Sequence, residues 1–352
     1  MSGEQYTKLN ELIGKDSLTI SEAMQKIDIN SYGVLFLNDS EGRLVACITD
    51  GDIRRFLLSG GKMDGKAIDA ANIHPKTAST GEEARQLYHK KNYIAIPIVD
   101  GQNRIVDVFT GDSRSDRIRA DLNVPVVINA GGRGTRLDPF TKVLPKPLIP
   151  VGNLPIIELI MNEYQSYGCK DFHIIVNYKK ELMKAYFHDN DNSYNITWYD
   201  EEKPLGTGGG LSLLRGKMDR TFFFSNCDAL LTANYESMLD FHRSQGNSIT
   251  MICAYKNINI PYGVVEMGEN GKIESMKEKP LFSFLTNTGI YIVEPDVIND
   301  IDDNEEIGFP DIIEREKQKG KKVAAFPVSE SDWMDMGQLP ELEKMRARLF
   351  GE

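Results

Sequence analysis

From Val126 onward, short apolar runs alternate with amphipathic segments. The apolar runs predict buried strands at 126–128, 172–176, 196–199, 222–225 and 249–254. Apolar residues spaced three and four apart predict helices at 156–167, 181–188 and 235–245, and a further helix that begins at 211–214. This order predicts an α/β fold with a Rossmann-like, mainly parallel sheet and helices on both faces.

The first ~120 residues contain a degenerate internal repeat. When the chain is shifted by 61 positions, the apolar run Val34–Asp39 falls on Ala95–Asp100, and Arg43–Thr49 falls on Arg104–Thr110. Polar turn residues separate the paired runs in both copies. Each copy therefore predicts helix, strand, turn, strand and helix. We divide the chain into a first repeat (1–60), a second repeat (61–122) and a larger domain (123–352), with a polar joint at 114–122.

The segment GRLVACITDGDIRRFL of the first repeat resembles cystathionine-β-synthase-type (CBS) domains, so a tandem CBS pair of α+β type is expected. In that family, a Thr-x-x-Asp at the junction of strand and helix holds an adenosyl group. Thr49 and Asp52 have this spacing, whereas Thr110 and Asp112 are one residue too close. The resemblance implies that AMP or ATP binds here; the alternative is a pair that only packs, for example between subunits of a homo-oligomer.

Composition narrows the choice of partners. The 352 residues carry a net charge of −11, so no basic excess exists to neutralise a nucleic acid. No stretch has the length of a membrane span and the N-terminus has no signal pattern, so no membrane partner is expected. The four cysteines show neither paired nor metal-ligand spacing, which predicts free thiols in the cytoplasm.

The most informative segment follows the strand at 126–128. Glycines at 131, 132 and 134 let backbone N–H groups approach a polyphosphate without side chains in the way. Arg136 and Lys146 supply the positive charge that a triphosphate needs, and the prolines on both sides of Lys146 restrict its backbone. The segment lacks the Gly-Lys-Ser/Thr ending of a Walker loop.

Three sequence motifs resemble the signature of the sugar-1-phosphate nucleotidyltransferases: GGRGTRL, PKPLIP and GNLPI. The resemblance covers about two thirds of the chain and implies that an NTP and a sugar 1-phosphate give an NDP-sugar and pyrophosphate. The expected nucleotide-binding residues are Ala130, Gly131, Gly132, Gly134, Thr135 and Arg136 in the first loop, and Gly206, Thr207, Gly208 and Gly209 in a second glycine patch.

The resemblance also assigns catalytic roles. Arg136 corresponds to the arginine that grips the leaving pyrophosphate, and Lys146 to the lysine near the α-phosphate. Asp228, just after the strand at 222–225, and Asp335, in a Trp-x-Asp-x-Gly pattern, correspond to the carboxylates that bind Mg²⁺. Two carboxylates with phosphate oxygens and water form an ordinary magnesium shell. Helix capping is the alternative role for each aspartate.

Three segments correspond to sugar-phosphate contacts in the family. The residues are Gly263, Glu278, Lys279, Asn287 and Thr288. Turns and hairpins are the alternative explanation for each segment.

The domain order resembles the guanylyltransferases that activate glucosamine 1-phosphate for bacterial legionaminic acid synthesis, so GTP and glucosamine 1-phosphate are the expected substrates. Mannose or heptose 1-phosphate is the nearest alternative acceptor, and UTP, CTP and TTP stay open as nucleotide substrates.

Glu201 and Glu202 precede the second glycine patch, and a carboxylate there would accept from the two donors of guanine's base-pairing edge. A rival from another class is a catalytically inactive nucleotide sensor. No hexapeptide repeats follow, which argues against an acyltransferase fusion.

Overall fold

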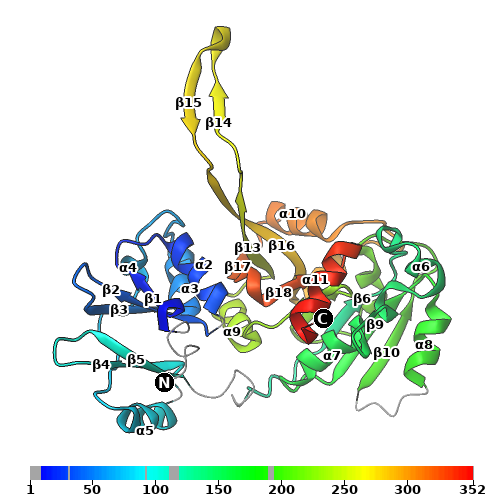
Figure 1. Ribbon diagram of the computed structural model, residues 1–352. Helices are drawn as coiled ribbons and strands as arrows, with labels where there is room; N and C mark the ends of the chain where they lie inside the picture. The colour runs from blue at the N-terminus through cyan, green and yellow to red at the C-terminus, as the bar shows by residue number, and fades with distance from the viewer. Residues whose placement is uncertain (1–8, 31, 92, 111–118, 189–193, 352) are drawn as a thin grey trace. The chain divides into compact units, whose positions relative to one another are not determined.

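The computed structural model describes residues 9–351 except 31, 92, 111–118 and 189–193 (Figure 1). Asp112 and most of the joint at 114–122 lie outside the described residues. The chain forms two compact units: unit 1 is residues 1–118 with 255–284, and unit 2 is residues 119–254 with 285–352. The segment 255–284, which we expected to belong to the larger domain, thus clusters with the N-terminal residues.

Unit 1 repeats its own structure with the offset seen in the sequence. In the first copy, β2 pairs antiparallel with β3 and a bulge lies between Leu37 and Asn38; in the second, β4 pairs with β5 and the bulge lies between Ile98 and Val99. The elements are β1 (Ile13–Lys15), α2 (Ile20–Asn30), β2 (Val34–Asn38), β3 (Leu44–Thr49), α3 (Asp50–Leu58), α4 (Ala67–Ala70), α5 (Gly81–Lys91), β4 (Ala95–Val99) and β5 (Ile105–Thr110). The predicted repeat of helix, strand, turn and strand is confirmed, whereas the last helix predicted for the second copy would begin in residues 111–118, outside the described residues.

The turn residues explain why each hairpin closes at the same place. Asp39 accepts hydrogen bonds from the backbone N–H groups of Glu41 and Arg43 at 2.9 Å each. Asp100 accepts from Gln102 and Arg104 in the same way. Aspartate favours such turns because its side chain bonds to the backbone two residues on.

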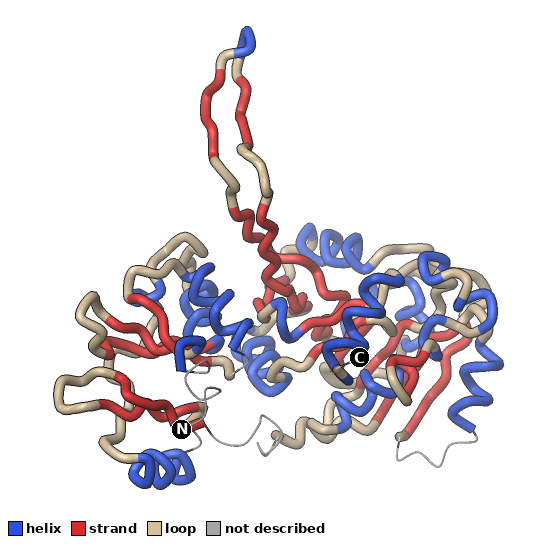
Figure 2. The backbone as a smooth tube through the Cα atoms, viewed as in Figure 1, coloured by secondary structure: helices blue, strands red, loops and turns tan. Residues whose placement is uncertain are grey.

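Unit 1 also contains a ribbon of two strands. Figure 2 shows β14 (Val264–Met267) and β15 (Ile273–Lys277) joined by the single turn η5 (Glu269–Gly271). Residues next to the ribbon contribute to the first repeat, because Tyr255 packs in its core and the Ser21 hydroxyl lies 3.3 Å from Asn257 Oδ1 and 3.1 Å from Ser283 Oγ.

Unit 2 is built on a seven-stranded sheet in the order β10-β9-β6-β11-β16-β13-β17. β10, β9, β6 and β11 are parallel neighbours, β16 runs antiparallel to β11, and β17 is parallel to β13. The strands are β6 (Val126–Asn129), β9 (Asp171–Val176), β10 (Asn195–Asp200), β11 (Phe222–Asn226), β13 (Ile249–Asn259), β16 (Leu281–Val293) and β17 (Val323–Val328). The predicted mainly parallel sheet is confirmed.

Both faces of this sheet are covered. Val126 and Ile128 of β6 belong to one apolar core, and Val127 between them belongs to the other, as alternation along a strand requires. The first core is shared with α7 (Ile156–Gln165), α8 (Lys180–His188), α9 (Tyr235–Gln245) and α11 (Leu339–Phe350). The second is shared with η4 (Gly209–Leu214), η6 (Pro295–Asp300) and α10 (Phe309–Gln318).

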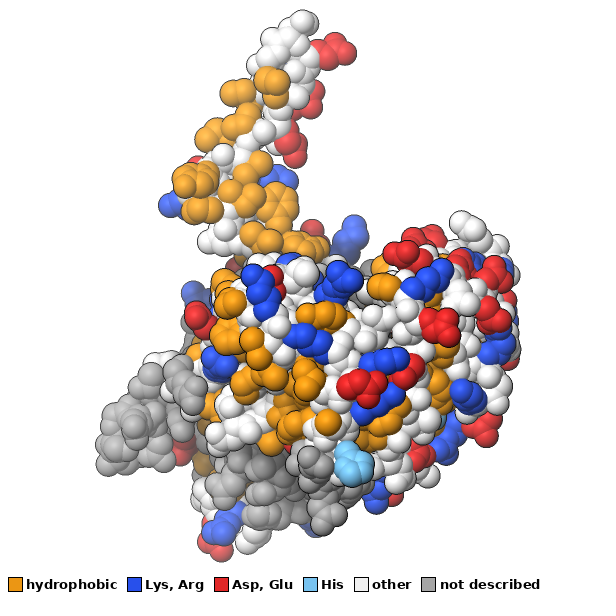
Figure 3. All heavy atoms as spheres, turned by 90° about the vertical axis from the view of Figure 1, so that its right-hand side faces the viewer, with side chains coloured by type: hydrophobic (Ala, Val, Ile, Leu, Met, Phe, Trp, Pro, Cys, Tyr) orange, Lys and Arg blue, Asp and Glu red, His pale blue; other side chains and the backbone are white. Residues whose placement is uncertain are grey.

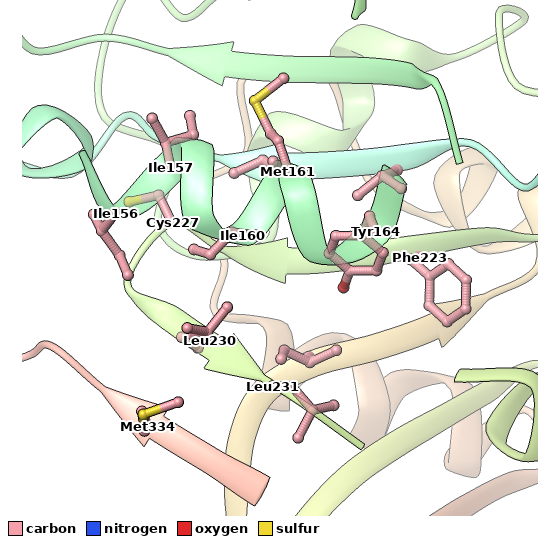
Figure 4. Close-up of a cluster of buried hydrophobic side chains, with 14 of the residues drawn as sticks. Ile156, Ile157, Ile160, Met161, Tyr164, Phe223, Cys227, Leu230, Leu231 and Met334 are labelled. Atoms are coloured by element: carbon pink, nitrogen blue, oxygen red, sulfur yellow. The ribbon is translucent and has the colours of Figure 1, made fainter. Parts of the chain in front are cut away.

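Short elements complete unit 2. They are η2 (Thr135–Leu137), α6 (Phe140–Val143), η3 (Lys146–Leu148), β7 (Pro150–Val151), β8 (Leu154–Pro155), β12 (Ala229–Leu231), η7 (Glu330–Asp332) and β18 (Trp333–Asp335). Figure 4 shows Ile156, Ile160 and Tyr164 of α7 in the same apolar cluster as Leu230 and Leu231 of β12. This packing fixes the residue just before β12, which belongs to the site described below.

The predicted helix beginning at Leu211 is wrong in type. The segment forms the 3₁₀-helix η4, which ends at Leu214. Glycine is a poor helix former, and a Cβ on Gly209 would lie 2.1 Å from the Glu305 carbonyl oxygen. Close packing therefore requires glycine at position 209.

The four cysteines are free thiols, of which Cys169, Cys227 and Cys253 are buried.

Candidate active site

Two strands place the two aspartates together. β12 pairs antiparallel with β18 so that Ala229 lies opposite Asp335, and the Met336 N–H donates to the Asp228 carbonyl oxygen at 2.9 Å. Asp228 immediately precedes Ala229, so both carboxylates belong to the same end of this small sheet. The negative charge of Asp228 also contributes to a raised pKa of Asp335.

Lys146 joins this pair from a different part of the chain. Its ammonium forms an ion pair with the Asp228 carboxylate, and the two side chains are only 11% and 14% exposed. Burial is the largest cause of the raised pKa of Asp335, followed by Asp228, while Lys146 and the exposed Arg136 lower it in part. The structure thus brings together Lys146, Asp228 and Asp335, while Arg136 acts on Asp335 only through its charge.

The donor set suits a divalent cation. Two partly buried carboxylates of like charge repel each other. They offer hard oxygen ligands of the kind that Mg²⁺ takes, with phosphate and water oxygens to complete the shell. Among the described residues, no cluster of three or more His, Cys, Asp or Glu side chains could hold a metal.

Two parallel strands deliver the glycine loop to the same place. Asn129, the last residue of β6, is in register with Asn226, the last residue of β11. The loop that starts at Ala130 and the segment that leads to Asp228 therefore leave the sheet side by side, at the carboxyl edge where ligands of such sheets bind.

The first glycine loop offers unused donors. Ala130 donates its N–H to Ile175 at 2.8 Å and Gly131 donates to the Asn129 side chain at 3.3 Å. Within the part of the chain that the structure describes, the N–H groups of residues 132–135 have no hydrogen-bond partner. Successive free N–H groups form an anion-binding concavity.

Gly134 connects the loop to the lysine. It has a left-handed backbone, with φ of 66°, and a Cβ there would lie 2.9 Å from Lys146 Cβ and 3.0 Å from Thr141 Cγ2. The Thr141 hydroxyl donates to the Gly134 carbonyl at 3.1 Å and lies 2.7 Å from the Asp138 carboxylate. Gly134 thus sets how closely the loop approaches Lys146.

Gly134→Ala should lower both the free energy of unfolding, by about 1–3 kcal/mol, and the activity, because the added methyl displaces Lys146. Gly246→Ala is the control, since Gly246 has a similar φ of 62° but nothing within 4 Å of its Cβ position. Denaturant unfolding and product release would be measured for both. Equal losses in the two variants would contradict the proposed contact with Lys146.

The second glycine patch is packed within unit 2, against the residues that lead into α10. The N–H groups of Gly208 and Gly209 lie 3.0 and 3.3 Å from the Ile307 carbonyl oxygen, and the Phe309 N–H donates to the Thr207 hydroxyl at 2.9 Å. Gly206 has a positive φ of 77° and, like Thr207, is exposed. Gly206 and Thr207 are therefore the members of this patch best placed to meet a ligand.

Asn129 is a residue that the sequence analysis missed. Its side-chain N–H₂ group lies 3.4 Å from the Gly206 carbonyl oxygen and 3.2 Å from that of Thr207, while its Oδ1 accepts from Gly131. One amide thus connects both glycine loops. Its place as the last residue of a strand before the glycines was the available signal.

Glu201, which the sequence analysis named together with Glu202, is distinguished from it by burial. It is 5% exposed, and burial raises its pKa to about 7 despite the Leu205 N–H, which lowers it. Its two carboxylate oxygens lie 2.7 Å from a Cβ position on Gly131 and 2.6 Å from one on Gly210. Among the described residues, Oε1 has no hydrogen-bond partner. The exposed Glu202 shares none of this.

The five sugar-phosphate candidates fall in both units. In unit 1, Glu278 Oε2 lies 3.0 Å from a Cβ position on Gly263, and the Lys279 N–H donates to Tyr262 at 3.2 Å. In unit 2, Asn287 accepts from the Gly289 N–H at 2.9 Å, and the Thr288 hydroxyl donates to Ile252 at 2.8 Å. Thr288 is 3% exposed, so its hydroxyl acts as a structural group.

In unit 1, Thr49 and Asp52 form a capping box at the start of α3. The Thr49 N–H and hydroxyl donate to the Asp52 carboxylate at 2.9 and 2.6 Å, and Arg55 forms an ion pair with its other oxygen at 2.5 Å. Thr110 is the last residue of β5, and its companion Asp112 lies outside the described residues. Capping therefore accounts for Thr49 and Asp52 without a ligand.

Known proteins are similar in sequence to the larger part of this chain. Residues 125–350 match the family described as nucleotidyl transferase. The mannose-1-phosphate guanyltransferase of Aspergillus oryzae is 34% identical over 226 residues, and that of Saccharomyces cerevisiae is 32% identical over 225 residues. The alignments cover 60% of this chain, and 60% and 61% of those proteins, so the chain spans less than two thirds of the curated relatives it matches.

Solved structures share the fold. HddC from Yersinia pseudotuberculosis has a TM-score of 0.51 and 21% identity, over 64% of this chain and 99% of that one. A putative glucose-1-phosphate thymidylyltransferase from Bacillus anthracis has a TM-score of 0.51 and 22% identity, over 64% and 94%. These matches agree with the mainly parallel α/β architecture of unit 2.

No helix in the described part of the chain has both the length and the apolar character to cross a membrane.

Proposed function

Because the chain belongs to the nucleotidyl transferase family, we propose that it transfers a guanylyl group from GTP to a sugar 1-phosphate and releases pyrophosphate. The observation that carries this proposal is the convergence of Lys146, Asp228 and Asp335 beside a glycine loop with free N–H groups. Mannose 1-phosphate is the favoured acceptor, since the relatives carry that name, ahead of glucosamine 1-phosphate.

The residues suit an in-line displacement. A phosphate oxygen of the sugar 1-phosphate attacks the α-phosphorus, and the bond from that phosphorus to the β-phosphate oxygen breaks. Charge accumulates on the phosphates, so catalysis needs cations and alignment more than a base. In this proposal the free N–H groups of the first loop and Arg136 hold the β- and γ-phosphates, and Lys146 faces the α-phosphate.

Asp228 and Asp335 are the residues that would hold Mg²⁺, which would supply positive charge at the phosphates. Lys146 occupies one oxygen of Asp228, so its ammonium and the cation would share that carboxylate. For the sugar phosphate, Asn287 is the candidate that belongs to the same unit as the two aspartates.

A substrate screen tests the proposal. GTP, UTP, CTP and TTP would each be combined with mannose, heptose and glucosamine 1-phosphate in the presence of Mg²⁺, and pyrophosphate release measured. We expect the fastest release with GTP and mannose 1-phosphate. No release with any pair would overturn the proposal and favour the inactive nucleotide sensor, whereas a preference for glucosamine 1-phosphate would change only the acceptor.

Glu201 supports guanine as the base. A buried carboxylate with a free oxygen can accept from both N–H donors of guanine's base-pairing edge, whereas uracil offers a single N–H. Sites built around such hydrogen bonds reject analogues that lack them. Its carboxylate lies between Gly131 of the first loop and Gly210, which directly follows the second glycine patch.

Glu201→Gln should reduce the preference for GTP over UTP about 10–100-fold, because the amide N–H₂ would face donors. The raised pKa, about 7, means that the acid is neutral below that pH and accepts fully only above it. We therefore expect the KM for GTP to rise as the pH falls from 8 to 6, and this dependence to vanish in Glu201→Gln. Glu202→Gln is the control; a pH profile unchanged in Glu201→Gln would exclude this role.

For the repeats of unit 1, we propose that adenine nucleotides bind at Thr49 and Asp52 and tune the activity. The support is the CBS resemblance and the confirmed repeat. Asp52→Ala should abolish the response to AMP or ATP, measured as calorimetric binding and as activity. Glu22→Ala is the control, because Glu22 accepts from the Thr19 N–H and hydroxyl at 2.8 and 2.9 Å in the equivalent cap of α2. A wild-type protein that binds neither nucleotide would remove the proposal.

A further inference from the structure

One side chain of unit 2 connects the first glycine loop with the second glycine patch. Asn129 is the last residue of β6, and its amide N–H₂ group lies 3.4 Å from the Gly206 carbonyl oxygen and 3.2 Å from that of Thr207. The oxygen of the same amide accepts from the Gly131 N–H at 3.3 Å. A side-chain amide carries donors on one side and an acceptor on the other, so Asn129 holds one segment with each side.

The bond to Gly131 alone would be an ordinary turn, because asparagine side chains commonly bond to the backbone two residues on, and serine does so more weakly. The bonds to the second glycine patch are different, since Gly206 and Thr207 lie 77 and 78 positions along the chain from Asn129. The patch follows β10, which β9 separates from β6 in the sheet. Pairing between neighbouring strands therefore does not hold the two segments together, and the Asn129 amide does.

Each segment is also anchored on its own. On one side, the Ala130 N–H donates to the Ile175 carbonyl oxygen of β9 at 2.8 Å. On the other side, the Thr207 hydroxyl accepts from the Phe309 N–H at 2.9 Å, and the Phe309 ring is buried in the second apolar core. What these anchors leave open is the distance between the two segments, which the Asn129 amide spans.

We propose that Asn129 is a positioning residue that sets the spacing between the triphosphate end and the base end of the nucleotide site. This inference rests on the proposed function, in which the first loop holds the β- and γ-phosphates and Glu201, close to Gly131 and Gly210, faces the base. A ligand held at both ends gains affinity only when the two subsites are spaced to match its own length. A spacing that is fixed before binding also reduces the ordering cost of binding.

The fold itself does not depend on this bridge. Gly206 and Thr207 are exposed, so water can bond to their carbonyl groups when the amide is removed. Large losses of stability follow when a buried polar group is left without a partner, which is not the case here. Removal of the amide should therefore change the affinity for the nucleotide and leave the free energy of unfolding nearly unchanged, and this difference separates a positioning role from a structural one.

The test titrates the full chain with the whole nucleotide and with its two parts, by calorimetry with Mg²⁺ and without a sugar phosphate. Asn129→Leu keeps the size of the side chain and removes both polar groups. The dissociation constant of GTP should rise about 10–100-fold, while those of pyrophosphate and GMP, each bound at one end, change less than about threefold. In the full reaction the KM for GTP should rise with little change in kcat, because Asn129 contacts none of the reacting atoms. Denaturant unfolding should match the wild type.

Two further variants separate the bridge from other effects. Asn129→Ser can still accept from the Gly131 N–H but is too short to reach the second glycine patch, so it should bind GTP as weakly as Asn129→Leu. Asn195→Leu is the matched control, because Asn195 begins the edge strand β10 and donates to Asp171 at 3.1 Å at the opposite end of the sheet. Figure 3 turns the side of unit 2 with β10 and α8 toward the viewer, and basic and acidic side chains are interspersed there. The loss of one amide on this polar surface should change neither binding nor stability.

Full GTP affinity in Asn129→Leu or Asn129→Ser overturns the inference. Equal losses of affinity for GTP, pyrophosphate and GMP also overturn it, since a general disturbance of the site would cause them. A wild type that binds GTP but releases no pyrophosphate with any sugar 1-phosphate removes the proposed function, whereas the titrations still decide the role of Asn129. A wild type that binds no nucleotide overturns both.

Discussion

Asp228→Asn is expected to reduce turnover on the order of 10²–10³-fold while the fold is retained, a loss typical of removing one electrostatic group from a transition state. The amide has the size of the carboxylate but lacks its charge, so the phosphates lose the cation that Asp228 and Asp335 would hold together. The neighbours of Asp228 are little disturbed, because Lys146 still has Asp335 nearby.

Single-turnover pyrophosphate release and Mg²⁺ titration measure this effect. Asp240→Asn, on the exposed side of α9, is the matched control and should keep full activity. If Asp228→Asn retained normal turnover with an unchanged magnesium requirement, the assignment of this carboxylate would be wrong and its ion pair with Lys146 would be structural.

Lys146→Met should abolish a similar share of the activity and also destabilise unit 2. Methionine keeps the apolar stem but leaves the Asp228 carboxylate, only 14% exposed, without its ion-pair partner. Breaking a buried pair from one side costs about 3 kcal/mol or more, most of which is the penalty of the remaining charge. Chemical denaturation and initial rates would be measured in parallel.

The double variant Lys146→Met with Asp228→Asn separates the two effects. Removing both charges should recover most of the lost stability, because no buried carboxylate remains uncompensated, but none of the activity. A double variant as unstable as Lys146→Met alone would show that the lysine stem, rather than the ion pair, matters for folding.

Much of unit 2 follows from local pattern. The apolar runs predict β6, β9, β11 and β13, because these strands are buried on both faces over most of their length. The edge strand β10 is predicted by alternation instead, since its residues 195, 197 and 200 are exposed. The glycine loop was predictable because it follows β6 directly. The 3₁₀ geometry of η4 was not, because it depends on the close approach of the Glu305 carbonyl to Gly209.

The candidate site was less predictable from the sequence, because it depends on pairings between residues far apart in the chain. Asp335 lies beside Asp228 only because β18 pairs with β12, and both strands have three residues, too few for any periodicity. The side-chain amide of Asn129 donates to carbonyl groups far along the chain. An asparagine at the end of a strand predicts a turn as readily as such a long-range hydrogen bond. The family resemblance, rather than the pattern, pointed to the aspartate pair.

The discontinuity of unit 1 has a consequence for biogenesis. The Ser21 hydroxyl contacts Asn257, 236 positions away, and Tyr255 fills the same core as Ile20 and Ile48. Domains generally fold as they emerge from the ribosome, N-terminal first. Here the first apolar core is complete only after Tyr255 has been synthesised, so residues 119–254 of unit 2 are translated before that core has all of its side chains. A nascent chain arrested before Tyr255 would therefore be a natural client for holdase chaperones.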